Sequence, residues 1–159
     1  MSLDREAIFS AIFTRLQAIP GLLTVSRKWK HFDDVPPEQQ PALFLNTGPE
    51  RCSHERGMPA KWTLQPTLHL YCRNDADPLA APGIQIHAIL RNIEAAFDRT
   101  AAEASIANGP FSDSGADSTG TTLGGLVNHA WIQGEIINDE GLLQGQALAI
   151  IPLEILTTS

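Results

Sequence analysis

Histidine and cysteine are the residues of this chain best suited to bind a metal or act as a nucleophile, and they are few and scattered. The chain has five histidines and two cysteines, and they come closest in the run Cys52-Ser53-His54. A closed zinc site needs four ligands in clustered pairs, and no second Cys/His pair has the required local spacing. We therefore predict an ordinary loop at residues 52–60, free thiols at Cys52 and Cys72, and no bound metal or cofactor.

Serine and carboxylate patterns give no stronger signal for an enzyme. Ser112 and Ser114 lie in a Gly/Ser/Asp-rich stretch without a G-x-S-x-G elbow, and a loop of this composition would position a serine poorly for attack. Aspartate pairs such as Asp75 and Asp77 lack the spacing and the terminal glutamate of an EF-hand, which favours turns. We predict that the chain is not an enzyme.

One predicted strand face mixes aromatic, apolar and polar side chains. Its alternate positions are Val127, His129, Trp131, Gln133, Glu135 and Ile137. A tryptophan among polar groups is typical of the centre of a protein interface. Two alternatives stay open: a helix covers Trp131, or His129 and Glu135 form a polar pocket for a small ligand.

Charge is divided unevenly along the chain. The net charge is −7, but residues 1–73 carry nine Lys/Arg against seven Asp/Glu, whereas residues 74–159 carry two against eleven. The one basic cluster, Arg27-Lys28-Trp29-Lys30, is interpreted as a solvated strand end, because binding to nucleic-acid phosphates needs more clustered Lys/Arg. We predict no specific binding of nucleic acid.

Hydrophobic periodicity predicts an α+β fold. Apolar residues recur every three or four positions in two amphipathic helices, at residues 3–19 and from Pro78 or Pro82 to about Thr100. Strands are expected at residues 22–29, 42–47, 61–73, 126–138 and 145–157, and the last two should form a hairpin through a turn at residues 138–141. The predicted order is α-β-β-β-α-β-β, which describes a mainly antiparallel sheet of about five strands with two helices packed on it.

Two strands carry a proline that constrains their place in the sheet. Trp62 lies on the apolar face of the strand at residues 61–73, and Pro66 interrupts the middle of that strand. Because proline has no N–H for the ladder, Pro66 and Pro152 are expected at a sheet edge or at a bulge. The last strand is apolar on both faces, which predicts cover on both sides by a helix, a sheet or another subunit.

The chain is expected to form one domain over residues 1–159, with a flexible loop at about residues 105–125. Its 159 residues match the usual size of a single domain. With 43% hydrophobic and 18% charged residues the sequence is too apolar for disorder, and no apolar run approaches the roughly 20 residues that span a bilayer. No export signal is visible, so we expect a reducing compartment and no membrane partner.

Several stretches together resemble the tail terminator and minor tail proteins of long-tailed bacteriophages and prophages. They are the opening helix and the strand after it, the segment from Trp62 to Tyr71, and above all the closing runs from Val127 to Gly134 and from Ile150 to Leu156. The resemblance covers most of the chain and rests on pattern and order. Residues 105–125 match least well.

The resemblance implies a structural subunit that forms a ring, expected to be a hexamer. Such a ring caps the tail tube, ends its polymerisation and provides the surface that joins the head. The implied partners are further copies of the chain, the tail tube protein and a head-completion or connector protein, while DNA passes through without specific binding. The implied location is the virion tail, reached after assembly in the bacterial cytoplasm.

Particular residues are assigned to this assembly. Candidates for subunit or partner interfaces are Trp62, Pro66, His129, Trp131 and Gln133, and Asp113 and Asp117 are candidates for the lumen or for axial contacts. The basic first half and the acidic second half would supply complementary patches for a ring if they lie on opposite sides of the protomer. Another neck or tail-completion protein is an alternative, and a small-ligand binding or hydrolytic domain is an alternative from a different class.

Overall fold

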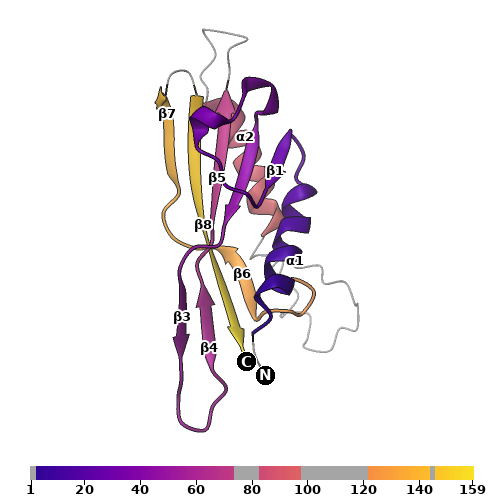
Figure 1. The fold of residues 1–159 in the computed structure, drawn as a ribbon, viewed down its shortest axis with the longest axis vertical. Coiled ribbons are helices and arrows are strands. Elements are labelled where there is room, and N and C mark those ends of the chain that lie inside the picture. The colour runs from indigo at the N-terminus through magenta and orange to yellow at the C-terminus, as the bar shows by residue number, and fades with distance from the viewer. Residues whose placement is uncertain (1–2, 74–82, 98–121, 144–145) are drawn as a thin grey trace.

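A computed structural model describes residues 3–73, 83–97, 122–143 and 146–159 (Figure 1). In these residues the chain forms a mixed α/β fold with two α-helices and one mainly antiparallel sheet of eight strands. The α-helices and strands are α1 (Arg5–Gln17), β1 (Thr24–Ser26), β2 (Ala42–Asn46), β3 (Glu50–Ser53), β4 (Lys61–Leu64), β5 (Thr67–Arg73), α2 (Gly83–Ala96), β6 (His129–Ile132), β7 (Ile137–Leu143) and β8 (Gln146–Thr158), and two short 3-10 helices, η1 (Phe32–Asp34) and η2 (Pro37–Gln39), lie between β1 and β2.

The long strand β8 runs through the middle of the sheet and belongs to both of its halves (Figure 1). In the upper half the strand order is β1-β2-β5-β8-β7, and in the lower half it is β3-β4-β8-β6. Only the β1–β2 pair is parallel among the strands described. The closing strand therefore holds together elements from the whole length of the chain.

Two prolines, Pro66 and Pro152, mark the line where the two halves of the sheet meet. Pro66 lies between β4 and β5, opposite Leu153, whose N–H donates to the Pro66 carbonyl at 2.9 Å. The pairs on either side of the break, Leu64 with Ile155 and Thr67 with Pro152, keep one register along β8. The sequence predicted a sheet edge or a bulge for Pro66 and Pro152, but both lie at a central interruption of the ladder.

The helix α1 forms because its apolar residues share one face and its first turn is capped. Ile8, Ile12 and Leu16 are buried, and the Asp4 carboxylate accepts a hydrogen bond from the Ala7 N–H at 3.0 Å. The spacing of these residues was enough to predict the helix. The cap is worth about 1 kcal/mol in comparable helices.

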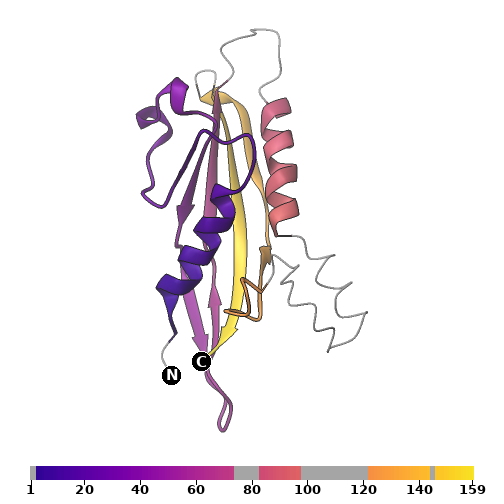
Figure 2. The ribbon, with the colours of Figure 1, turned by 90° about the vertical axis from the view of Figure 1, so that its right-hand side faces the viewer.

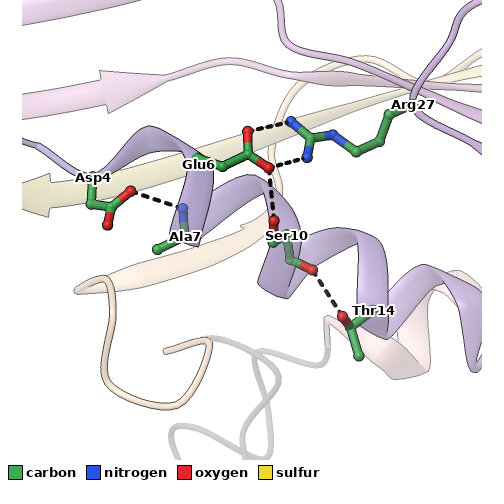
Figure 3. Close-up of polar contacts among 6 residues, drawn as sticks. All are labelled: Asp4, Glu6, Ala7, Ser10, Thr14 and Arg27. Atoms are coloured by element: carbon green, nitrogen blue, oxygen red, sulfur yellow. Dashed lines mark hydrogen bonds and ion pairs between the residues drawn. The ribbon is translucent and has the colours of Figure 1, made fainter.

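The polar face of α1 is tied to the end of β1 (Figure 3). The Glu6 carboxylate accepts hydrogen bonds from both terminal nitrogens of Arg27 and from the Ser10 hydroxyl. The Arg27 guanidinium, helped by Ser10, lowers the pKa of Glu6 from 4.5 to about 2. Since the Glu6 side chain is 72% exposed, this pair adds little stability and mainly orients the helix.

Both helices pack on one face of the sheet and form the main core with it. The sheet residues of this core alternate along each strand, as in Ile151, Leu153 and Ile155 of β8, and they meet Ile12 of α1 and Ile93 of α2. Figure 2 shows α2 on one side of the upper strands and the segment between β1 and β2 on the other. That segment covers a second, smaller cluster around Phe44 and Tyr71.

The strand assignments differ from the sequence-based expectation in three places. Residues 50–53 form the edge strand β3, although residues 52–60 were predicted to be a loop, because their polar sequence has no apolar alternation to reveal the pairing with β4. Residues 61–73 and 126–138 are each divided between two strands. The predicted turn at residues 138–141 lies inside β7, where a bulge between Asp139 and Leu143 absorbs the turn-forming residues. The sheet therefore has eight strands where about five were expected.

Candidate functional site

The side of the sheet opposite the two helices, here called the helix-free face, is the candidate functional surface. Along β8 the residues pointing to the helices are buried, while Ile150, Pro152, Glu154 and Leu156 on the other side are only partly buried. The prediction that both faces of this strand are covered therefore holds for the helix side. At the upper end, the side chain of Gln40 donates to the Gln146 side-chain oxygen at 3.2 Å and closes the helix-free face there.

A stacked pair of rings occupies the lower half of this face. The rings of His129 and Trp131 lie 3.6 Å apart with an angle of 1° between their planes, because residues two apart on β6 point to the same side. The His129 Nε2 lies 3.3 Å from a carboxylate oxygen of Glu154 on the neighbouring strand. The side chains of His129 and Glu154 remain 16% and 30% exposed. Two flat rings and a carboxylate therefore form one partly exposed platform.

The strand register places an arginine at the opposite side of the same face. Arg51 pairs with Thr63, Thr63 with Leu156, and Leu156 with His129, so these four residues form one row across β3, β4, β8 and β6. Arg51 is exposed, while Thr63 and Leu156 are partly buried. Arg51 puts a positive charge at β3, His129 puts an aromatic ring at β6, and Glu154 of β8 adds a negative charge beside that ring.

A second aromatic group lies at the upper end of the helix-free face. Trp29 is 47% exposed and its ring meets that of His69 edge-on at 6.1 Å. The Tyr71 hydroxyl donates to the Lys30 carbonyl at 3.0 Å, which fixes the segment after β1 over the sheet. Burial lowers the pKa of His69 from its ordinary value of 6.5 and raises the pKa of Tyr71.

The lowered pKa of His69 predicts that the protein loses stability as the pH falls. An unfolded chain protonates this histidine near pH 6.5, whereas the folded chain keeps it neutral to lower pH. The unfolded state therefore binds more protons below about pH 6.5, and the free energy of unfolding decreases there. Urea titrations at several pH values should show a shallower decrease for His69→Gln than for the wild type. Equal pH slopes for the two proteins would contradict the assignment.

Three of the residues predicted from the sequence lie elsewhere than on this platform. Trp62 belongs to the helix side, where its Nε1 donates to the Ser159 hydroxyl at 3.1 Å and the Arg5 guanidinium lies 4.8 Å from its ring centre. Pro66 lies in the interior of the sheet, as described above. Val127, expected beside His129, is buried in the helix-side core.

The remaining predicted residues divide into three groups. His129 and Trp131 come together as expected, and helix α2 does not cover Trp131, which faces away from the helices. Gln133 is exposed just after β6, and its N–H donates to the Pro152 carbonyl at 3.2 Å. Asp113 and Asp117, together with the predicted loop at residues 105–125 as far as residue 121, lie outside the described residues.

Other reactive groups give little chemistry in the part of the chain that the structure describes. The Cys52 sulfur lies 3.3 Å from the His54 Nε2 on the β3–β4 hairpin, but no group of three or more metal-binding side chains occurs in residues 3–73, 83–97, 122–143 and 146–159. Burial raises the pKa of Cys72 to about 12, so its thiol is unreactive near neutral pH. A cavity of about 200 Å³ lies between Leu3, Ile8 and the end of β8, and the platform residues do not line it.

Two charged residues of the helix-free face were missed by sequence reasoning. Arg51 lies between the predicted strand at residues 42–47 and the predicted loop at residues 52–60, and Glu154 lies in a strand predicted to be apolar on both faces. A charged residue that alternates with buried Leu153 and Ile155 is a usable signal for an exposed strand face. Arg51 gave no such signal, since its neighbours in β3 are polar.

The described residues define a class of protein by fold and surface: a mixed α/β chain with two helices on one face of a mainly antiparallel sheet and an aromatic platform on the other. Scans against protein-family models and against curated proteins find no match to this chain. Among the helices described, none has the length and apolar character needed to cross a membrane.

Proposed function

We propose that this chain is a structural subunit of a bacteriophage tail that caps the tail tube as a ring. The observation that carries the proposal is the partly exposed lower half of the helix-free face, with the stacked His129 and Trp131 beside partly buried Leu156. Partly buried aromatic and aliphatic groups with a polar rim are typical of surfaces that bury themselves against another protein.

The chemistry of the platform favours contact over catalysis. One ring face of His129 lies against Trp131 and its Nε2 lies beside the Glu154 carboxylate, so this face and this nitrogen are already engaged within the chain. Glu135, which the alternative hypothesis places in a pocket with His129, is exposed beyond the end of β6.

The distribution of charge supports a ring. On the helix-free face of the lower half-sheet, one edge strand, β3, carries Arg51, and the opposite edge strand, β6, lies beside Glu154. Residues 122–159 contain Glu135, Asp139, Glu140 and Glu154 but no Lys or Arg. A ring needs two different surfaces of one protomer to meet, and sides of different charge are suited to this.

The proposed assembly ends tube growth and passes DNA without binding it specifically, because an acidic surface repels phosphates. Its other contacts are with the tail tube protein below and with a head-completion or connector protein above. It works in the virion, after assembly in the bacterial cytoplasm. The hexameric state belongs to the same proposal.

The proposal is tested by adding the purified chain to polymerising tail tube protein and measuring tube lengths by electron microscopy. A terminator shortens the tubes in proportion to its concentration and appears as a cap at one end. If tube lengths are unchanged and the chain instead binds a purified connector, it is another neck or tail-completion protein. If it binds neither, the phage assignment is wrong.

A further inference from the structure

The edges of the lower half-sheet have opposite strand directions. Within the described residues β3 and β6 each have a single strand neighbour, β4 and β8 respectively. All neighbours in the order β3-β4-β8-β6 are antiparallel, so β3 runs with β8 and β6 runs against it. A second copy placed beside the first in the same orientation would therefore bring β6 and the neighbour's β3 together as antiparallel strands.

The upper half-sheet has the same property. Its edges are β1, which runs with β8, and β7, which runs against it. The placement that suits β6 and β3 therefore suits β7 and β1 as well. Exposed edge strands readily pair with strands of another chain, because their outward N–H and C=O groups need partners.

We propose that neighbouring protomers join by antiparallel pairing of β6 with the next protomer's β3, with Arg51 of that protomer lying on the Trp131–His129 platform beside Glu154. The proposal rests on the proposed ring and names the contact that closes it. It commits to a second copy of this chain as the partner.

The strand register explains why Arg51 is the residue that fits. Arg51 and the platform both lie on the helix-free face, so pairing β3 with β6 makes them cross-strand neighbours about 5 Å apart. Glu154 is one strand further, roughly 10 Å away and within reach of an arginine side chain. A guanidinium stacks on an indole and also donates to a carboxylate, which an ammonium group does less well. The chain already uses this stacking on its other face, where Arg5 lies over Trp62.

Charge also sets the direction of the contact. A two-fold pairing of β3 with β3 would bring two Arg51 side chains together, and pairing of β6 with β6 would bring two Glu154 carboxylates together. Like charges on neighbouring strands are destabilising. Only the head-to-tail pairing brings opposite charges together, and head-to-tail contacts generate closed rings when the rotation allows closure.

The test uses two variants that each damage one side of the contact, Arg51→Glu and Trp131→Glu. Sedimentation velocity measures their assembly, both free and bound to tail-tube ends. Each variant alone should bind its own copies on the order of 10- to 100-fold more weakly than the wild type. An equimolar mixture should form dimers and nothing larger, because Arg51 of one variant meets the intact platform of the other and the outer sides cannot extend.

A matched control and a rescue keep the test decisive. Arg56→Glu makes the same charge change on the exposed end of the same hairpin and should assemble like the wild type. Combining Arg51→Glu with Glu154→Arg in one chain should restore part of the assembly, whatever Trp131→Glu does to folding. The proposed contact is wrong if Arg51→Glu assembles normally or if the equimolar mixture forms species larger than a dimer. It is also wrong if the wild type is monomeric both free and at tail-tube ends. If the Arg51→Glu chain forms rings of normal mass and still shortens tubes, the β3–β6 contact is wrong but the proposed terminator function is not.

Discussion

Replacing Gly48 with alanine is expected to remove about 3 kcal/mol or more of the free energy of unfolding. Gly48 lies between β2 and β3 with φ +65°, a conformation that alanine adopts only with strain. An added Cβ would also lie 2.0 Å from the Gln65 carbonyl oxygen and 2.9 Å from its carbon. Both atoms are backbone at the line where the half-sheets meet, so they cannot rotate away as a side chain could.

Gly57→Ala is the matched control for this prediction. Gly57 has φ +80°, but an added Cβ would meet no atom within 4 Å, so only the backbone strain of about 1–2 kcal/mol remains. Urea unfolding followed by circular dichroism gives both values. Equal losses for the two variants would show that the crowding at Gly48 is relieved, and the close packing of residues 48 and 65 would then be disproved.

The helices were predictable because their signal is local. Apolar spacing in α1 and the Asp4 cap lie within one short stretch of sequence, and the burial of Ile8, Ile12 and Leu16 follows from it. The strand predicted at residues 61–73 was recognised from its alternation, although the structure divides it into β4 and β5, and β8 was recognised from its long apolar run. The extra strands were not, because β3 is recognised only through its partner β4.

The prolines were placed wrongly in the sheet although the rule used for them, that proline has no N–H for a ladder, is correct. Pro66 cannot donate to a ladder, and the sequence alone offered an edge or a bulge as the solution. The structure uses a third solution, in which the ladder is interrupted on neighbouring strands along one line, with Pro66 accepting from Leu153 and Pro152 accepting from Gln133. Such an alignment depends on the register of strands about 90 residues apart, which no local pattern contains.

The candidate site divides in the same way. His129 and Trp131 could be paired from the sequence because they are two residues apart on one strand. Glu154 joins them only through the β6–β8 register, and Arg51 enters the same face only through two further pairings. The face was thus predictable from its aromatic half, whereas its charged half depends on the fold.

Introducing a charge at the centre of this face should abolish assembly and leave the fold intact. In Trp131→Glu, a new carboxylate would lie on the same face as Glu154, to which Trp131 is directly opposite in the ladder. Burying two like charges under a neighbouring protomer costs several kcal/mol, which is more than a ring contact of ordinary strength can absorb. Because Trp131 loses its stack on His129 and the new carboxylate faces Glu154 within the chain, the free energy of unfolding should fall by about 2 kcal/mol.

The control for this variant is Ile84→Glu, which places the same charge on an apolar side chain that is 68% exposed on α2, on the opposite side of the sheet. It should cap tail tubes like the wild type, while Trp131→Glu should leave tube lengths at their uncapped values. Circular dichroism and the unfolding midpoint separate a lost contact from a lost fold. If a folded Trp131→Glu chain shortens tubes as the wild type does, the helix-free face is not the surface on which assembly depends, since an interface centred on Trp131 cannot tolerate that charge.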